Sequence, residues 1–223
     1  MPTLDRHDDV FVLDLGDGEN RFSPDWLAAV DAALDEVEGA DGPRALVTAA
    51  TGKFFSNGLD LAWLLDHADQ REAYLGTVER LFARVLCSPV FSVAAVQGHA
   101  FAAGAMLALA HDQRVMRADR GFWCLPEIDI DLPFSPGMSA LIQARLSPQV
   151  AHVAMTTGRR YGGSDALAAG IVDAAVGEDA VRSAAVELAA AHAGKAGPVL
   201  GTIKSRLYAP VLALLRGRTA PVG

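Results

Sequence analysis

The chain has 223 residues, of which 51% are apolar and 21% are charged, so it can form a folded core and is not a disordered chain. Its formal net charge of −8 argues against general nucleic-acid binding, which requires a basic surface. The longest nearly apolar run, 100–110, is too short to span a bilayer, which argues against a membrane protein.

The two ends of the sequence and its cysteine content indicate the cellular compartment of the protein. The start is polar and acidic, unlike a secretory signal, and residues 220–223 do not form a peroxisomal address. Cys87 and Cys124 are too few for a disulfide framework, and we expect both to be reduced thiols in or near the core. These features predict a cytoplasmic protein.

Strand and helix patterns alternate over the first part of the chain. Hydrophobic periodicity and turn residues predict, in chain order, a strand over 10–15, a helix over 25–37, a strand over 44–49, a loop over 51–57, a helix beginning over 59–65, a helix over 73–87, a strand over 90–96, a helix over 101–111 and a strand over 113–116. Ser23-Pro24 is expected to start the first helix, because serine is a common N-cap and proline is favoured at the first helical position.

Helical patterns dominate the rest of the chain. They cover residues 136–145, 148–156, 164–169, 180–193 and 198–215. The whole pattern predicts the α/β class, with a core over residues 1–145 and a helical region over 146–223.

The loop after the predicted strand 44–49 contains a candidate anion-binding turn. Gly58 permits a positive φ and a close approach of another backbone. The N–H groups of Leu59 and its neighbours would then point outward from a first helical turn, unpaired and able to bind a negatively charged oxygen. Taken alone, these residues favour an ordinary helix start, since strand-to-helix turns with glycine are common.

A second turn of the same kind follows the predicted strand 90–96 and Gly98. Residues 102–105 are Ala102-Ala103-Gly104-Ala105, and such small side chains let a ligand or another backbone come close. The partial positive charge of a helix N-terminus favours an oxyanion there. Alone, the segment also fits a closely packed buried helix, and its spacing matches neither a Walker A loop nor a dinucleotide-binding motif.

Glu127 is the candidate catalytic side chain. It lies in the apolar segment Phe122-Trp123-Cys124-Leu125-Pro126-Glu127-Ile128. Apolar surroundings raise the pKa of a carboxyl group and make it a better proton shuttle. Because Asp129 and Asp131 follow closely, a surface glutamate after a proline turn is the alternative interpretation.

Together the three segments resemble the crotonase (enoyl-CoA hydratase/isomerase) superfamily, with clear motifs over about residues 10–145. Within it, 54–63 and 106–122 look most like the Δ3,Δ2-enoyl-CoA isomerases of the plant peroxisomal type. The resemblance implies a crotonase (ClpP/crotonase-like) ββα spiral with a helical C-terminal trimerisation region, assembled as a homotrimer or a dimer of trimers. The apolar faces of 181–191 and 203–215 are compatible with such an assembly.

The resemblance also implies roles for single residues. The thioester oxygen of an acyl-CoA would lie between the backbone N–H groups of Leu59 and Ala103. The hydratases of the superfamily carry two glutamates, one at the position of Glu127 and one at that of Met106. A thioether cannot hold and polarise water, so the departure at Met106 favours isomerisation by Glu127 alone, moving a proton from C2 of a 3-enoyl-CoA to C4.

The expected ligand is an acyl-CoA, with no separate cofactor and no metal, since the histidines lack metal-ligand spacing. By resemblance, the backbone around Ser56 to Asp60 is expected to contact the adenine side of CoA. The residues expected to bind the substrate are Ser56, Asn57, Gly58, Leu59, Asp60, Ala103 and Gly104. Because CoA is a polyanion, Arg21, Lys53 and Lys204 are candidates for its phosphates, although each is also consistent with an ordinary surface charge. His99 could line the pocket or serve as a structural residue.

Three alternatives stay open at the level of the sequence. Asp129 or Asp131 could supply a second carboxylate for a hydratase, another acyl-CoA reaction could use a single glutamate, or the protein could be a non-catalytic acyl-CoA-binding trimer. A mere binder has no need of a glutamate in an apolar run. We therefore expect a Δ3,Δ2-enoyl-CoA isomerase of fatty-acid β-oxidation.

Overall fold

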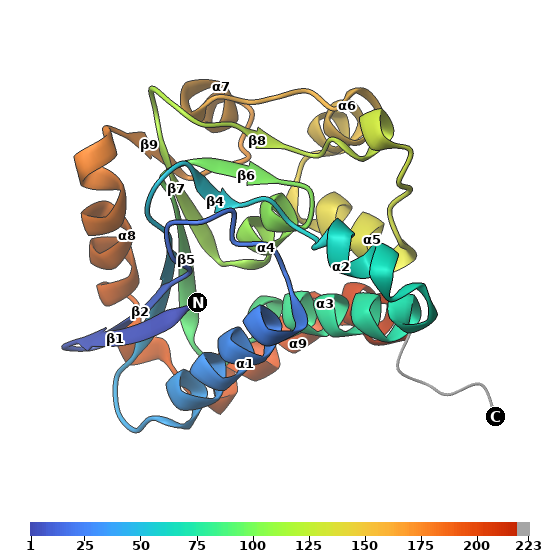
Figure 1. Ribbon diagram of the computed structural model, residues 1–223. Helices are drawn as coiled ribbons and strands as arrows, with labels where there is room; N and C mark the ends of the chain where they lie inside the picture. Colours follow the sequence, from blue (N-terminus) through green and yellow to red (C-terminus); the bar gives the residue numbers. More distant parts are fainter. Residues whose placement is uncertain (218–223) are drawn as a thin grey trace.

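A computed structural model describes residues 1–217, and the last six residues, 218–223, lie outside the described part. The expected helical region 146–223 and the C-terminal sequence 220–223 therefore fall partly or wholly outside it. The architecture is a six-stranded sheet with helices on both faces and a second, three-stranded sheet beside it (Figure 1).

The larger sheet, sheet A, has the strand order β1-β2-β3-β5-β7-β9. Its strands are β1 (Thr3–His7), β2 (Val10–Asp14), β3 (Ala45–Ala49), β5 (Phe91–Val96), β7 (Gln113–Arg117) and β9 (Ala174–Val176). Only the β1–β2 pair is antiparallel; the other neighbours run parallel. The smaller sheet, sheet B, is parallel and contains β4 (Phe54–Ser56), β6 (His99–Phe101) and β8 (Trp123–Cys124).

The chain repeats one path three times. A strand enters sheet A, the next strand enters sheet B, and a helix follows: β3, β4 and α2 (Leu61–Asp66), then β5, β6 and α4 (Ala103–Ala110), then β7, β8 and a short 3₁₀ turn η2 (Glu127–Ile130). The ββα repeat is therefore as expected, and the carboxyl ends of the sheet B strands lead directly to the candidate site segments.

The remaining helices fill in around the sheets. They are α1 (Pro24–Gly39), α3 (Arg71–Leu86), α5 (Pro136–Arg145), α6 (Pro148–Thr157), α7 (Gly163–Ala168), α8 (Val181–Ala190), α9 (Pro198–Leu207) and α10 (Ala209–Arg216), with short 3₁₀ turns η1 (Ala68–Gln70), η3 (Glu178–Ala180) and η4 (Ala193–Lys195). The expected Ser23-Pro24 start of the first helix is confirmed: Ser23 Oγ accepts a hydrogen bond from the N–H of Trp26 at 3.3 Å.

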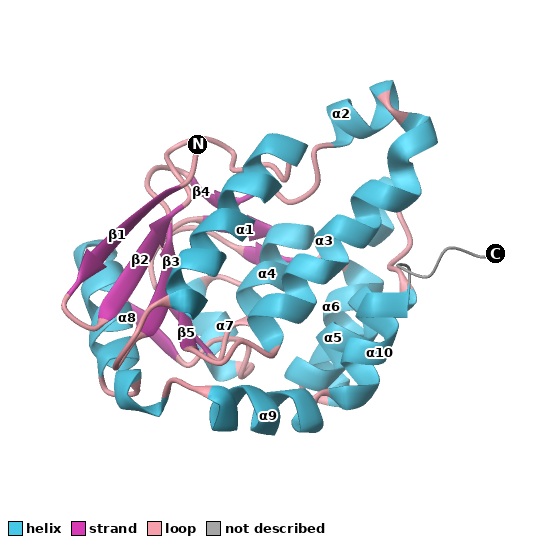
Figure 2. Ribbon diagram, turned by 90° about the horizontal axis from the view of Figure 1, so that it is seen from below, coloured by secondary structure: helices cyan, strands magenta, loops and turns pink. Residues whose placement is uncertain are grey.

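Sheet A separates two hydrophobic clusters, because alternate residues of a strand point to opposite faces. On one face Phe11, Leu13 and Leu46 belong to the cluster that includes residues of α1, α3 and α4. On the other face, Val12 and Val47 pack with α8. Figure 2 shows α8 on one side of the sheet and α1, α3 and α4 on the other.

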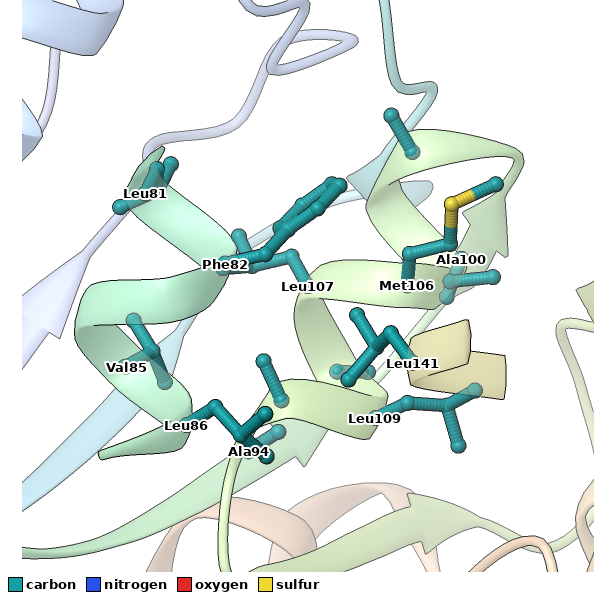
Figure 3. Close-up of a cluster of buried hydrophobic side chains, with 14 of the residues drawn as sticks. Leu81, Phe82, Val85, Leu86, Ala94, Ala100, Met106, Leu107, Leu109 and Leu141 are labelled. Carbon is teal, nitrogen blue, oxygen red and sulfur yellow. The ribbon is translucent and has the colours of Figure 1, made fainter. Parts of the chain in front are cut away.

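The centre of the larger cluster lies between α3 and α4. Phe82 and Leu86 of α3 meet Leu107 of α4, and Leu141 of α5 closes one side (Figure 3). Every residue of α4 is buried. Because α4 has no solvent-facing side, its small residues are needed for packing as well as for the turn that precedes it.

The structure corrects several expected elements. Sheet B strands have two or three residues each, too few for a periodic signal, so β4 was expected to be loop and β6 was expected to belong partly to a helix. The expected helix 198–215 is two helices that meet at Tyr208. Within 146–217, β9 pairs with β7 at the edge of sheet A, so this region is not purely helical.

The apolar face of α8 does not serve the role expected of it. Val181, Ala185 and Ala189 are buried against sheet A of the same chain. This face is therefore not available for contacts between subunits, and the expectation for 181–191 is wrong. On α9, by contrast, Val199, Ile203 and Leu207 are 71%, 57% and 66% exposed.

Candidate active site

The first turn packs backbone against backbone. Gly58 has φ +79°, and a Cβ atom built on it would lie 2.8 Å from the backbone nitrogen of Ala103 and 3.0 Å from the carbonyl oxygen of Phe101. Only glycine fits such a position without strain. The contact brings the turn after β4 against the turn after β6, so Leu59 and Ala103 become neighbours although 44 residues apart (103 − 59).

The side chain of Ser56 holds the first turn in place. Its side chain is fully buried; Oγ donates to the carbonyl oxygen of Asn20 at 2.7 Å and accepts from the N–H of Gly58 at 3.1 Å. A Cβ on Gly104 would lie 2.4 Å from the carbonyl oxygen of Ser56, which fixes the second turn on the first. The Ser56 side chain therefore supports the turn, and a contact of the backbone around Ser56 with CoA stays a prediction.

The second turn begins α4 with an unusual backbone conformation. Ala102 has φ +50° and ψ −123°, a conformation that L-residues rarely adopt and that costs about 1–3 kcal/mol. It sets the start of α4 at Ala103. Within residues 1–217, the backbone N–H groups of Leu59 and Ala103 donate to no acceptor, so both are available to a ligand oxygen.

Glu127 starts the turn η2 and is only 4% exposed. Burial raises the pKa of its carboxyl group from the ordinary value of 4.5 to about 7, and a backbone hydrogen bond opposes this shift. Its Oε2 atom has no hydrogen-bond partner among the described residues. A carboxyl group with a pKa near neutrality and an unoccupied oxygen suits proton transfer.

One cavity of about 440 Å³ contains all three features. Leu59 and Ala103 line it together with Glu127 and Met106. A large part of its lining comes from one segment, 126–136, which we call the wall segment and which contributes Pro126, Glu127, Ile130, Leu132, Pro133, Phe134, Ser135 and Pro136. Leu64 and Phe101 also line the cavity, whereas Trp63 and Trp123 do not.

Met106 is the residue that faces the cavity one turn into α4. It is 1% exposed and belongs to the main hydrophobic cluster (Figure 3). Asp129 and Asp131 are both exposed and do not line the cavity. Of the acidic residues 1–217, only Glu127 lines this cavity, so neither aspartate supplies the second carboxylate that hydration was expected to require.

The candidate cations differ in their positions. Arg21 lines the cavity, and its Nη1 donates to the carbonyl oxygen of Leu59 at 3.4 Å. Lys53 is exposed but lines a separate hollow, as does His99. Lys204 is 4% exposed, with Nζ 2.6 Å from Asp112 Oδ2 and 3.1 Å from the carbonyl oxygen of Val90, so it has no free face for a phosphate and that expectation is wrong.

Other expected CoA contacts have structural roles or remain open. Asp60 caps α2 by accepting from the N–H of Trp63 at 3.1 Å, and it does not line the cavity. Asn57 does line it, which leaves its contact with CoA as a prediction. Arg71 and Leu75 of α3 also line the cavity but were not anticipated. The only signal in the sequence that could have grouped Arg71 with Leu75 is their spacing of four residues, which places both on one face of a helix.

Two further observations limit the choice of site. A larger hollow of about 830 Å³ lies along α1 and α3, and neither Glu127 nor the two turns line it. Among residues 1–217, no group of three or more His, Cys, Asp or Glu side chains is arranged to hold a metal ion.

No helix in this part of the chain is long and apolar enough to cross a membrane. Cys87 and Cys124 are unpaired, as expected.

Comparisons with known proteins agree with the geometry. The chain is 36% identical to enoyl-CoA delta isomerase 2, peroxisomal, of Arabidopsis thaliana over 96% of its own length and 95% of the relative's. It is 37% identical to enoyl-CoA delta isomerase 3 of the same plant, with coverage of 93% and 92%. The fold matches an apo enoyl-CoA isomerase of Mycobacterium tuberculosis with a TM-score of 0.90 at 29% identity, covering 97% of this chain and 95% of that one. Residues 6–218 match the enoyl-CoA hydratase/isomerase family, and the chain belongs to that family.

Proposed function

We propose that this protein is a Δ3,Δ2-enoyl-CoA isomerase that converts a 3-enoyl-CoA into the conjugated 2-trans-enoyl-CoA in fatty-acid β-oxidation. The observation that carries the proposal is the composition of the cavity. It is lined by a single carboxylate, with a pKa near 7, and by two backbone N–H groups that donate to no acceptor among the described residues. Met106 lies at the position where the hydratases of the superfamily carry a second glutamate. The two Arabidopsis thaliana relatives, both named enoyl-CoA delta isomerases, support it.

The first step is removal of a proton from C2. Ionised Glu127 takes it through Oε2, the oxygen without a protein partner. The negative charge spreads to the thioester oxygen, which lies between the N–H groups of Leu59 and Ala103. Such donors bind the developing oxyanion more strongly than the neutral carbonyl, and losing one donor typically costs about 10²–10³-fold in rate.

The second step returns the proton at C4. Glu127 is now neutral, a form that its buried position favours. Protonation of the dienolate at C4 moves the double bond into conjugation with the thioester. Met106 and the apolar lining leave no second carboxylate to hold water, so the proton returns to carbon and no hydroxyl group is added.

CoA is the carrier portion of the substrate, so the reaction needs no separate cofactor. Within residues 1–217, Arg21 and Arg71 are the positively charged residues that line the cavity, and we propose that they attract the phosphates of CoA. Arg21 is the better positioned for this, since its contact with the Leu59 carbonyl oxygen places it beside the oxyanion turn. Asn57 contributes the neighbouring polar surface.

We also propose that the protein assembles as a trimer or a dimer of trimers. The exposed apolar residues Val199, Ile203 and Leu207 recur every four residues and so lie on one face of α9. An apolar face of this kind, spread over almost the whole helix, favours burial against another subunit. The compartment stays a prediction: the sequence favours the cytoplasm, and two of the Arabidopsis thaliana relatives are named as peroxisomal.

Hydration is the second candidate reaction, because a Mycobacterium tuberculosis relative with 30% identity over 93% of the chain is named a probable enoyl-CoA hydratase. A paired assay on the purified protein separates the two. One arm supplies a 3-enoyl-CoA and follows the ultraviolet absorbance of the conjugated thioester as it forms. The other supplies a 2-enoyl-CoA and follows its loss. Isomerisation without hydration is the expected result, and hydration at a comparable rate would contradict the proposal.

A non-catalytic acyl-CoA-binding protein would behave differently from either enzyme. It would bind acyl-CoA in a calorimeter and turn over neither substrate. The variant E127Q provides the matched control, because its amide keeps the shape of the carboxyl group but cannot take a proton. If wild type and E127Q bind equally and only wild type turns over, binding and catalysis are separated.

A further inference from the structure

A second buried glutamate, Glu79, lies behind the wall of the cavity. It is on α3 and its side chain is fully buried. It follows Arg71 and Leu75, both of which line the cavity, at intervals of four residues. Residues at this spacing share one face of a helix, so Glu79 continues the stripe of α3 that faces the cavity.

The carboxylate of Glu79 meets the wall segment at Ser135. Ser135 Oγ donates to Glu79 Oε1 in a short hydrogen bond and accepts from the N–H of Met138 at 3.1 Å. Ser135 is therefore the N-cap of α5 and the contact point between α5 and α3. It also lines the cavity itself, next to Pro133 and Phe134.

The rest of the wall segment has little regular structure to hold it. Between η2 and α5, residues 131–135 belong to no helix or strand, and Asp131 has a left-handed backbone with φ +51°. The N–H of Leu132 donates to the carbonyl oxygen of Glu127 at 3.1 Å, which ties the first half of the segment to the catalytic turn. The hydrogen bond from Ser135 to Glu79 ties the second half to α3.

The hydrogen bond between Ser135 and Glu79 is better suited to fixing the position of the wall segment than to filling space in the core. Burying a carboxyl group is costly, and an apolar side chain would fill the same space without that cost. A hydrogen bond, unlike an apolar contact, fixes the direction and rotamer of its partner. Glu79 thus sets the orientation of Ser135, and through it the position of Pro133 and Phe134 in the cavity.

We propose that Glu79 is a positioning residue that, through Ser135, fixes the wall segment against α3 and thereby determines which acyl chains the cavity accepts. The inference rests on the proposed isomerase function, because it assigns to this cavity the acyl chain of the substrate. Since Leu132 is tied to Glu127, displacement of the wall also reaches the catalytic turn.

The test compares variants by their preference for acyl length. The measured quantity is the ratio of kcat/KM for a short and a long 3-enoyl-CoA, together with Tm. E79L and S135A, which both remove the hydrogen bond, are expected to change this ratio about tenfold. E79Q retains an amide oxygen that can accept from Ser135 and is expected to restore the wild-type ratio to within about twofold. These fold-changes correspond to about 1.4 and 0.4 kcal/mol.

A matched control separates positioning from loss of stability. Val78 is the neighbour of Glu79 on α3, is fully buried and does not line the cavity. V78A is expected to lower Tm and leave the ratio unchanged. The proposal is overturned if folded E79L and S135A both keep the wild-type ratio, or if V78A changes it equally. S135A provides the answer if E79L does not fold.

Failure of the proposed function can be recognised separately. If wild type isomerises no 3-enoyl-CoA, the isomerase assignment fails, and the wall is then tested by binding alone. Dissociation constants for saturated acyl-CoA thioesters of increasing length, measured by calorimetry, require no turnover. A length preference that E79L and S135A alter and V78A does not would support the role of Glu79. Equal preferences in all four proteins would refute it.

Discussion

The cavity has two unlike sides, one built from backbone and one from side chains. The backbone side consists of the two turns at Leu59 and Ala103, locked together where Gly58 and Gly104 each approach the backbone of the other turn. The side-chain side is the wall segment with Glu127. The first offers fixed dipoles whose strength does not depend on residue type, and the second offers a group that can change its charge. Oxyanion binding and proton transfer are thus assigned to parts with different sensitivity to substitution.

The largest expected effect comes from the side-chain side. E127Q removes the proton acceptor but keeps the shape, so kcat is expected to fall by about 10²–10⁴-fold, the usual contribution of a positioned base. Affinity for a saturated acyl-CoA should change less than about threefold. Steady-state kinetics and calorimetry measure the two quantities. Residual turnover above one tenth of wild type would show that another group moves the proton.

The backbone side is tested by G58A. The added Cβ would lie 2.8 Å from the Ala103 nitrogen, at a φ that alanine tolerates poorly, so the two donors must move apart. We expect kcat to fall by about 10²-fold, comparable to the loss of one oxyanion donor. G162A is the control, since φ there is −70° and nothing lies within 4 Å of the added Cβ. Equal kinetics for G58A and wild type would contradict the assigned donors.

The pH dependence distinguishes the two sides, because the backbone N–H donors carry no titratable group and Glu127 does. With a pKa of about 7 and activity carried by the ionised form, kcat/KM should rise about tenfold between pH 6 and pH 8. Stability should change in the opposite direction. The pKa is raised on folding, so the native state binds more protons than the unfolded state between pH 4.5 and about 7, and stability falls as pH rises through that window.

The difference between 4.5 and about 7 corresponds to at most about 3–4 kcal/mol at 1.4 kcal/mol per unit. Denaturant unfolding of wild type and E127Q at pH 4.5 and pH 8 measures this term. E127Q should be the more stable protein at pH 8, with a smaller difference at pH 4.5. A wild-type profile of kcat/KM that is flat from pH 6 to pH 8 would remove the basis for a base with a pKa near 7.

The variant M106E tests whether the cavity can be made to catalyse hydration. A second carboxylate in the cavity would raise the pKa of Glu127 by repulsion; a rise of about one unit lowers its ionised fraction at pH 7 about fivefold. Isomerisation should fall by this factor, and hydration of 2-enoyl-CoA should become measurable. M106L, which nearly conserves volume, should retain isomerisation without hydration. No hydration by folded M106E would show that water is excluded by shape as well as by chemistry.

The smallest effect is expected at the donor residue itself. L59M conserves the volume of a buried side chain and leaves the backbone N–H in place, so stability should fall by less than about 1.5 kcal/mol and kcat by less than about threefold. Measuring kcat of L59M and of E127Q with the same substrate allows the two variants to be compared directly. A large loss in L59M with normal stability would mean that the side chain, and not the backbone, carries the function at this position.

The sequence by itself determined the chemistry-bearing residues and the course of the long elements. The glycine at 58, the small residues at 102–105 and the glutamate among apolar neighbours at 127 each fit an ordinary structural role when taken alone, and it was their combination, with the family resemblance, that predicted two donor turns and one raised pKa. The helix over 136–145 and the capped start at Ser23-Pro24 also followed from local signals. These features depend on side-chain size, backbone freedom and periodicity, which are local properties.

Only the tertiary structure decided which residues share the cavity. The sequence allows Lys204 to be a surface cation, but the fold buries it beside Asp112, and it is the fold that makes the Ser56 hydroxyl support a turn. Strands of two or three residues in sheet B carry no period, since pairing with neighbours defines them. Glu79 and Ser135 are 56 residues apart, and their hydrogen bond depends on how α3 packs against the wall segment, a long-range contact that no local pattern encodes.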